Sequence, residues 1–300
     1  MGGGGNAAGL VTGREIMRDI VGREEVQRLI AEELQADQGP GDATTNALVD
    51  AGQRVVAVIL TREDCVVSGT GVAAVAFRQL DSQLRVVVER KDGAWAQAGD
   101  VLLRVEGSAR AILTAERTAL NFMQRMCGIA TLTKRFVDAV APLPVNILDT
   151  RKTTPGLRVM EKYAVVCGGG QNHRFGLYDK IMIKDNHRRF WSGGKSLASA
   201  IGAARAHHPD LPIEIEVESP DELRDALRGH PDEVLLDNMS LEMMRACVAL
   251  CKGKCLTEAS GGITLENVRA VAETGVDAIS LGCLTHAFRS VDLSLEMESL

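Results

Sequence analysis

Short apolar runs alternate with segments of helical character throughout the second half of the chain. Six runs have the length of a strand, and they cover residues 145–149, 180–184, 212–217, 233–237, 255–258 and 277–281. Helical segments lie between them, for example residues 220–228, which follow the favourable capping residue Ser219. The last four runs recur roughly every 20 residues, the length of a compact βα unit, which predicts parallel strands.

The first half of the chain has a different pattern. Its strand-like runs cover residues 55–61, 65–68, 84–90 and 101–106. The predicted helices cover residues 24–35, 72–80, 109–125 and 129–140. This order predicts an α+β domain of about 110–130 residues that precedes a barrel. Because only six barrel strands are visible, the barrel is either incomplete or completed by an element from the first half.

The composition is that of an ordinary globular protein, with 45% hydrophobic and 25% charged residues. The longest uncharged interior stretch, residues 65–77, is too short to cross a bilayer. The leader lacks the basic and apolar regions of a signal peptide, and Asn6 stands where a myristoylation signal has Ser or Thr. A cytoplasmic location is therefore expected.

Seven cysteines, an odd number without the spacing of a disulfide framework, predict reduced thiols. Only Cys247, Cys251 and Cys255 are clustered. We expect the first two to lie on one face of a helix and the third to begin the next strand. No Cys-x-x-Cys pair accompanies them, so a zinc site is not indicated.

The charge of the chain is unevenly distributed. A net charge of −6 argues against nucleic acid as a partner. Residues 151–189 nevertheless hold nine Lys and Arg against three acids, which is 9 − 3 = +6. A solvated basic surface is the ordinary interpretation of such a run. Here the cations alternate with glycine turns and strand ends, which favours a focused pocket for a small polyanion.

Ionisable residues stand where the predicted barrel strands end. The strand ends include Asp149 to Lys152, Lys184 to His187, Glu216 to Ser219, Asp237 with Asn238, and Glu258 to Gly262. In a βα barrel the carboxyl ends of the strands converge on one face, which carries the active site. Five successive charged ends are better explained by an active site than by solvated loop starts.

Glycine-rich loops follow several of these strands. Ser260-Gly261-Gly262 and a second loop that ends in Gly282 come after the last two strands. Such loops often bind phosphate, because a glycine lets backbone amides approach the oxygens. Three further glycines precede His173 and Arg174. They are either a helix cap with a flexible loop or a device that brings this pair to a ligand, and we favour the second interpretation.

Cations and acids occupy opposite edges of the predicted site. Arg151, Lys152, Arg174 and Lys184 would repel one another unless a ligand with carboxylates and phosphates neutralised them. The acids, Glu216 and Asp237, pair with these cations, hold Mg²⁺ through its water shell, bind ribose hydroxyls, or stabilise positive charge at an anomeric carbon. Together with the phosphate loops, they favour a sugar-phosphate substrate.

The chain resembles the quinolinate phosphoribosyltransferase family, the carboxylating nicotinate-nucleotide pyrophosphorylases. The resemblance rests on motifs spread over nearly the whole sequence. They are residues 39–45 (GPGDATT), 116–121 (ERTALN), 149–156 (DTRKTTPG), 167–174 (CGGGQNHR), 183–187 (IKDNH), 236–239 (LDNM) and 260–263 (SGGI). Two departures are visible, Gln171 where His or Met is common and the glycine-rich leader, and neither puts the reaction in doubt.

The resemblance implies an N-terminal α/β sandwich domain and an incomplete α/β barrel of the TIM type. The sandwich would comprise residues 1–128, joined by the tail 287–300, and the barrel residues 129–286. The family assembles as dimers or multiples of dimers, and Arg117 would be donated across the dimer interface. No nucleic-acid or membrane partner is implied.

The resemblance also implies the reaction and its residues. Quinolinate and phosphoribosyl pyrophosphate would give nicotinate mononucleotide, pyrophosphate and CO₂, on the route to NAD. Mg²⁺ would be carried by the pyrophosphate with Glu216 and Asp237 nearby, and no organic cofactor is needed. The catalytic residues would be Lys152, Lys184, Glu216 and Asp237. The substrate-binding residues would be Arg117, Arg151, Lys152, His173, Arg174, Lys184, Glu216, Asp237, Ser260, Gly261, Gly262 and Gly282.

Three other functions remain open at this point. A paralogous phosphoribosyltransferase would act on another pyridine or heterocyclic base. A Schiff-base aldolase would use Lys184 at its strand end, although four clustered cations do not suit it. A non-catalytic nucleotide or phosphate sensor would not need the acids Glu216 and Asp237.

Overall fold

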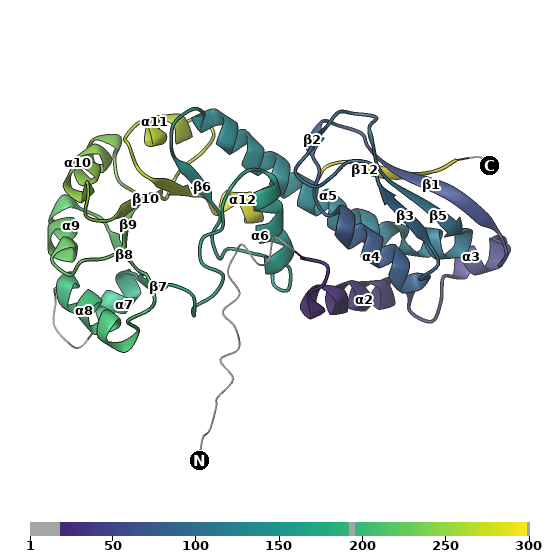
Figure 1. The fold of residues 1–300 in the computed structure, drawn as a ribbon, viewed down its shortest axis with the longest axis horizontal. Helices are drawn as coiled ribbons and strands as arrows, with labels where there is room; N and C mark the ends of the chain where they lie inside the picture. Colours follow the sequence, from purple (N-terminus) through teal and green to yellow (C-terminus); the bar gives the residue numbers. More distant parts are fainter. Residues whose placement is uncertain (1–18, 192–195, 299–300) are drawn as a thin grey trace, which may run out of the picture. The chain divides into compact units, whose positions relative to one another are not determined.

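The computed structural model describes residues 19–191 and 196–298, which form two compact units (Figure 1). The first, here called the barrel unit, comprises Arg135–Arg151 and Gly170–Gly282. The second, the sandwich unit, comprises among the described residues 19–134, 152–169 and 283–298. The predicted domain boundaries, 1–128 with 287–300 against 129–286, remain a prediction about independently folding domains.

The barrel unit is built on a parallel sheet of six strands. In spatial order these are β6 (Asn146–Leu148), β11 (Ala278–Ser280), β10 (Leu256–Ser260), β9 (Glu233–Asp237), β8 (Ile213–Val217) and β7 (Ile181–Ile183). Within the described residues no strand pairing joins β6 to β7, so the barrel is incomplete. The parallel strands and the open barrel predicted from the sequence are confirmed.

Helices cover the outside of this sheet, as Figure 1 shows for the stretch from α8 to α11. They are α7 (Asp185–Phe190), α8 (Leu197–His207), α9 (Pro220–Leu227), α10 (Leu241–Cys251) and α11 (Val268–Ala272). The side chain of Ser219 accepts a hydrogen bond from the amide of Glu222, and Pro220 opens α9, as the capping pattern predicts. Leu223 and Ala226 are the buried residues of this helix.

The sandwich unit contains an antiparallel sheet whose edge is the C-terminal strand. Its order is β12 (Leu293–Glu298), β1 (Arg54–Thr61), β5 (Val101–Ser108) and β3 (Arg85–Val88). A separate ribbon pairs β2 (Cys65–Val66) with β4 (Trp95–Ala96). The helices are α2 (Glu24–Gln38), α3 (Ala43–Leu48), α4 (Thr70–Leu80), α6 (Arg158–Cys167) and α12 (Cys283–His286).

One long helix replaces two of the predicted helices. Residues 109–125 and 129–140 belong to the single helix α5 (Ala109–Val140), which has 32 residues. Gly128, which lies between the two predicted helices, allows close packing. A Cβ at this position would lie 2.3 Å from the carbonyl oxygen of Arg289. The residue allows two segments of backbone to approach, and the helical hydrogen bonds continue through it.

Two smaller expectations concern thiols and membranes. All seven cysteines are free thiols, as predicted. Cys247 and Cys251 lie on α10 and are buried, and Cys255 directly precedes β10. Among the described helices, none has both the length and the apolar character needed to cross a bilayer.

Candidate active site

The carboxyl ends of the barrel strands bring several predicted site residues to one edge of the sheet. Lys184 follows β7, Glu216 lies on β8, and Asp237 and Ser260 end β9 and β10. Ser260 is the direct register partner of Asp237. Parallel strands in register must place these four side chains at the same edge. The folded chain therefore assembles this part of the predicted site from four separate segments.

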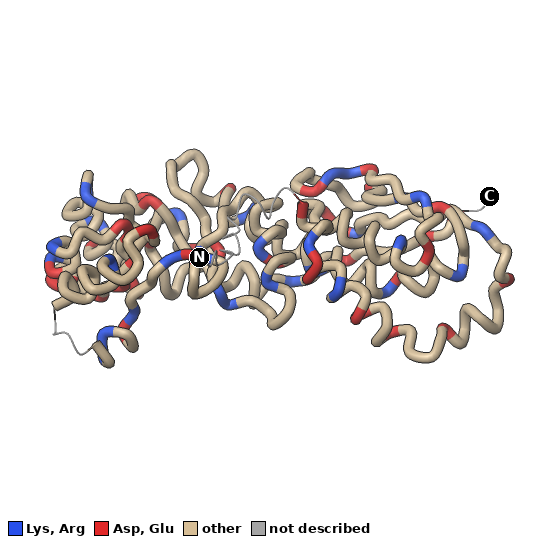
Figure 2. Tube along the Cα trace, turned by 60° about the horizontal axis from the view of Figure 1, so that its bottom comes forward, with Lys and Arg blue, Asp and Glu red and all other residues tan. Residues whose placement is uncertain are grey.

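An ion pair joins the basic and acidic edges of the site. The Nζ atom of Lys184 lies 3.0 Å from a carboxylate oxygen of Glu216. The Glu216 side chain is 10% exposed and that of Lys184 is 41% exposed, so the lysine faces the solvent side. Basic and acidic residues are mixed along the backbone of the barrel unit, as the blue and red segments of Figure 2 show. Among the roles considered for the two acids, pairing with a cation is therefore observed for Glu216.

Two arginines of the predicted site influence each other through their charges. The pKa of Arg174 is lowered, first by burial and then by the positive charge of Arg151. The guanidinium of Arg174 donates a hydrogen bond to the carbonyl of Lys180 at 3.2 Å. The Nε atom of Arg151 is buried and makes no hydrogen bond within the part of the chain that the structure describes. Two guanidinium groups with spare donors suit a ligand with adjacent carboxylates.

The loop that carries His173 and Arg174 is anchored to the end of β6. Gln171 forms a β-bridge with Leu148. The buried carboxylate of Asp149 then accepts hydrogen bonds from the amide of His173 at 2.9 Å and from the side chain of Asn172 at 2.6 Å. Sequence reasoning had assigned no role to Asp149. Its position as the last residue of the predicted strand 145–149 was the available signal.

The two glycines of the Ser260-Gly261-Gly262 loop have different tasks. Both have positive φ angles, 89° for Gly261 and 63° for Gly262. A Cβ on Gly261 would lie 2.2 Å from the side-chain oxygen of Asn238, whereas a Cβ on Gly262 would meet nothing within 4 Å. Asn238 in turn donates a hydrogen bond to Asp237 at 2.8 Å. Gly261 thus lets the loop lie against the Asp237 region, and Gly262 leaves open space beside the backbone.

Two buried acids to which sequence reasoning gave no individual role, Glu214 and the strand-end residue Glu258, lie against His173. Its Nε2 atom is 3.0 Å from Glu214 and 3.3 Å from Glu258. Burial alone would lower the pKa of His173, but hydrogen bonding to the two carboxylates raises it to about 9. The amide of Arg174 donates to Nδ1 at 2.7 Å, which opposes full protonation because a protonated Nδ1 cannot accept. In the sequence, these acids could be noticed only as charged residues within strands that are otherwise largely apolar.

The two carboxyl groups respond differently to this environment. Burial pushes the pKa of Glu214 up, but the hydrogen bond and charge of His173 and the charge of Lys180 outweigh it and lower the pKa overall. Burial followed by the charge of Glu214 raises the pKa of Glu258. The pKa of Glu258 is therefore the higher of the two, and Glu214 ionises first.

Comparison with known proteins identifies the family of this chain. The profile of the quinolinate phosphoribosyl transferase C-terminal domain matches residues 129–296, and that of the N-terminal domain matches residues 42–127. A probable nicotinate-nucleotide pyrophosphorylase [carboxylating] of Bacillus subtilis is 40% identical over 273 residues, which cover 91% of this chain and 93% of that protein. The chain belongs to the quinolinate phosphoribosyl transferase family.

Other family members agree in sequence and fold. The nicotinate-nucleotide pyrophosphorylase [carboxylating] of Mycobacterium leprae is 41% identical over 92% of this chain and 96% of its own length. The solved nicotinate-nucleotide pyrophosphorylase of Francisella tularensis superposes with a TM-score of 0.88 at 39% identity, covering 91% of this chain and 96% of that one. The resemblance inferred from the motifs is confirmed at the level of family and fold.

Two of the predicted family residues belong to the sandwich unit. Arg117 lies on α5 and is exposed. Lys152 is also exposed, and its carbonyl accepts a hydrogen bond from Thr285 at 2.7 Å. The loop after Lys152 is held by the buried carboxylate of Glu161, which accepts from the amide of Thr154 at 3.1 Å. Lys184, Glu216, Asp237 and Ser260 therefore meet at one edge of the barrel sheet. Arg117 and Lys152 belong to the sandwich unit.

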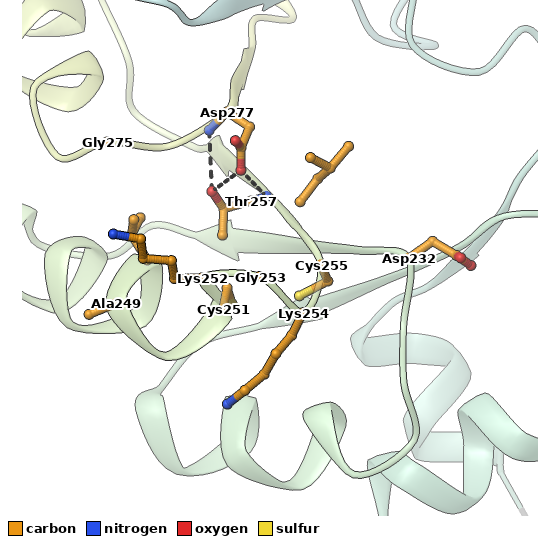
Figure 3. A pocket seen from close by; sticks show the side chains of 12 residues that line it. Asp232, Ala249, Cys251, Lys252, Gly253, Lys254, Cys255, Thr257, Gly275 and Asp277 are labelled. Carbon is orange, nitrogen blue, oxygen red and sulfur yellow. Dashed lines mark hydrogen bonds between the residues drawn. The ribbon is translucent and has the colours of Figure 1, made fainter.

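Two cavities of the barrel unit lie in different places. One of about 520 Å³ is lined by Arg174, Lys180 and His187 together with apolar residues of β7 and α8. Another, of about 620 Å³, lies where β9, β10 and β11 begin, and Figure 3 shows its lining. Asp277 there accepts hydrogen bonds from the amide and hydroxyl of Thr257 at 2.8 and 2.7 Å. None of the predicted substrate-binding residues lines this second cavity.

Proposed function

We propose that this chain transfers the phosphoribosyl group of phosphoribosyl pyrophosphate to quinolinate with decarboxylation. The products are nicotinate mononucleotide, pyrophosphate and CO₂, and the reaction belongs to NAD biosynthesis. The supporting observation is the Lys184–Glu216 ion pair at the strand ends. It is joined by the buried Nε atom of Arg151, which has no hydrogen-bond partner among the described residues, and by the effect of its charge on Arg174. Relatives that are about 40% identical carry the name nicotinate-nucleotide pyrophosphorylase [carboxylating]. A cytoplasmic location remains a prediction.

Quinolinate is a pyridine with two neighbouring carboxylates, and it needs a planar cationic site. Arg151 and Arg174 supply fork-shaped donors that match carboxylates, and each charged hydrogen bond contributes roughly 1.5–3 kcal/mol. The pKa of Arg174 is lowered by burial and then by the positive charge of Arg151, and a bound anion would offset both effects. In this proposal the carboxylates of quinolinate bind at Arg151 and Arg174, where they offset the positive charges of the two guanidinium groups.

The sugar phosphate lies at the other strand ends in this proposal. The open backbone at Gly262 accommodates a phosphate, and Ser260 stands beside Asp237 in the sheet. Mg²⁺ fits this edge, because Glu216 and Asp237 offer the hard carboxylate oxygens that it prefers, reached through its water shell. When bound, Mg²⁺ neutralises the leaving pyrophosphate. Both carboxylates then face the anomeric carbon.

The residues suit a reaction that needs little acid–base chemistry. As pyrophosphate departs, positive charge grows at the anomeric carbon, and Glu216 and Asp237 stabilise it. The pyridine nitrogen forms the new bond to this carbon. The quaternised ring then accepts the electron pair released when the adjacent carboxylate leaves as CO₂. The resulting carbanion takes a proton from a cationic group, either Lys152 or Lys184.

The assay that tests this function uses the purified full-length protein. With quinolinate, phosphoribosyl pyrophosphate and Mg²⁺ we expect nicotinate mononucleotide and CO₂ in equal amounts. Nicotinate replaces quinolinate in the control reaction, which should give neither product. Turnover of nicotinate without CO₂ would indicate the paralogous phosphoribosyltransferase. Imine trapping by borohydride at Lys184 would indicate the aldolase.

Arg117 provides a test of a shared site. We propose that the protein is a dimer, or a multiple of dimers, in which this exposed arginine contacts quinolinate bound to the partner subunit. Arg117→Ala and Arg174→Ala should each be inactive alone. Mixed and reassociated, they should recover about a quarter of the wild-type activity, because half of the dimers are hybrids with one intact site. No recovery above the sum of the separate variants would contradict the shared site.

Gly261 and Gly275 form a matched pair for testing the phosphate loop. Both have φ angles of 89°, but a Cβ on Gly261 would collide with Asn238 at 2.2 Å, whereas one on Gly275 would contact Val248 at 3.6 Å. We expect Gly261→Ala to raise the KM for phosphoribosyl pyrophosphate about tenfold. Gly275→Ala carries the same backbone strain and should leave this KM within about twofold. Steady-state kinetics and melting temperatures of both variants check the prediction.

A further inference from the structure

The layer of the barrel beneath the site carries charges where such barrels normally pack branched apolar side chains. Glu214 is fully buried on β8, and Glu258 is 2% exposed on β10. Side chains two residues apart on a strand share a face, so Glu214 lies one layer below Glu216. Both acids reach the same ring, that of His173, from two strands that flank β9.

Burying these two carboxyl groups away from water destabilises the folded state. Beyond their contacts with His173, the four carboxylate oxygens have no hydrogen-bond partner among the described residues. Their compensation is the contact with His173 and, for Glu214, the ammonium of Lys180 at 3.6 Å. Apolar side chains of similar volume would fill the space without this desolvation cost. The acids therefore do something that packing alone does not require.

The ring of His173 links these acids to Arg174. Its Nε2 side faces the two carboxylates, and its Nδ1 atom accepts the amide of Arg174 at 2.7 Å. The backbone amide of His173 donates a hydrogen bond to Asp149 at 2.9 Å. The orientation of the His173 ring thus fixes the position of the backbone amide of Arg174, from which the quinolinate-binding side chain extends.

We propose that Glu214 and Glu258 are positioning residues that hold His173 and thereby align Arg174 for quinolinate. This inference rests on the proposed function, and it adds two residues that touch no substrate. The acids anchor the imidazole from below, and the imidazole anchors the peptide of Arg174. Loss of either anchor leaves the guanidinium present but misaligned, which weakens quinolinate binding more than any other step.

The near-isosteric variants Glu214→Gln and Glu258→Gln test this inference. Glu233→Gln is the matched control, because Glu233 lies on the intervening strand and pairs with Lys180 without contacting His173. We expect Glu214→Gln to raise the KM for quinolinate about tenfold and Glu258→Gln about threefold. The KM for phosphoribosyl pyrophosphate and kcat should stay within about twofold in both. Glu214→Asp, which keeps the charge, should recover part of the loss.

Several outcomes would overturn the inference. One is a quinolinate KM in Glu214→Gln no higher than in the Glu233→Gln control. Another is a parallel fall of kcat and both substrate affinities with the melting temperature, which would mark a purely structural role. Stoichiometric metal that is lost in Glu214→Gln would assign the cluster to a cation, since its three ligand atoms lie within 4.8 Å of one another. If the wild-type protein turns over no quinolinate, the proposed function fails, while calorimetric quinolinate binding by wild type and variant still decides the positioning role.

Discussion

Arg174→Ala is expected to raise the dissociation constant for quinolinate about a hundredfold, the loss of two charge-assisted hydrogen bonds or roughly 3 kcal/mol. The arginine is half buried beside Arg151, which lowers its pKa together with burial, and its guanidinium makes a hydrogen bond to the carbonyl of Lys180. Removing it relieves repulsion in the free protein, so the fold should survive. Calorimetric titration of quinolinate and a melting curve measure the two effects separately.

Two companion variants make this result specific. Arg174→Lys keeps the charge but not the fork geometry, and it should fall between wild type and alanine. Arg205→Ala removes an arginine whose partner is Asp232 at 3.0 Å, and it should leave quinolinate affinity within about twofold. Unchanged affinity in Arg174→Ala would remove this residue from the binding site and with it the main support for the proposed substrate.

Asp237→Asn is expected to lower kcat about a hundredfold to a thousandfold while changing both KM values little. The carboxylate ends β9 beside Ser260 and is oriented by a hydrogen bond from Asn238 at 2.8 Å. The substitution preserves shape and removes the negative charge that stabilises the anomeric carbon in the transition state. Groups aimed at developing charge typically contribute factors of this size.

Single-turnover kinetics separate the chemical step from product release for this variant. Glu242→Gln, in the first turn of α10, removes a surface carboxylate of the same unit and serves as the control. A kcat within about threefold of wild type in Asp237→Asn would contradict the electrostatic role. The acid would then be a structural partner, as Glu216 is for Lys184.

Much of the barrel could be predicted from local pattern. The runs at 181–183, 213–217 and 233–237 are strands because apolar residues bounded by caps and glycines favour buried parallel strands. The same pattern located the strand ends and hence Lys184, Glu216 and Asp237. The pattern was wrong where it predicted two helices, 109–125 and 129–140, because α5 runs through Gly128, and the glycine serves close packing against Arg289.

The residues missed by sequence reasoning are those whose importance depends on contacts across the sheet. Asp149 looked like one more strand-end charge until it proved to hold the backbone of His173. Glu214 and Glu258 interrupt apolar strands, and a sequence offers no way to tell an inward-facing acid from one that faces a helix surface. Their common contact with His173 arises from segments far apart in the chain.

The sequence by itself determined the class of fold, the alternation of strands and helices, the charged ends of the strands and the family. These properties are local, because periodicity, capping residues and glycine turns act over a few neighbouring positions. Only the tertiary structure decided which charges meet: Lys184 with Glu216, Arg151 with Arg174, and His173 with two buried acids. The reason is that sheet order and strand register set distances between residues that no local pattern relates.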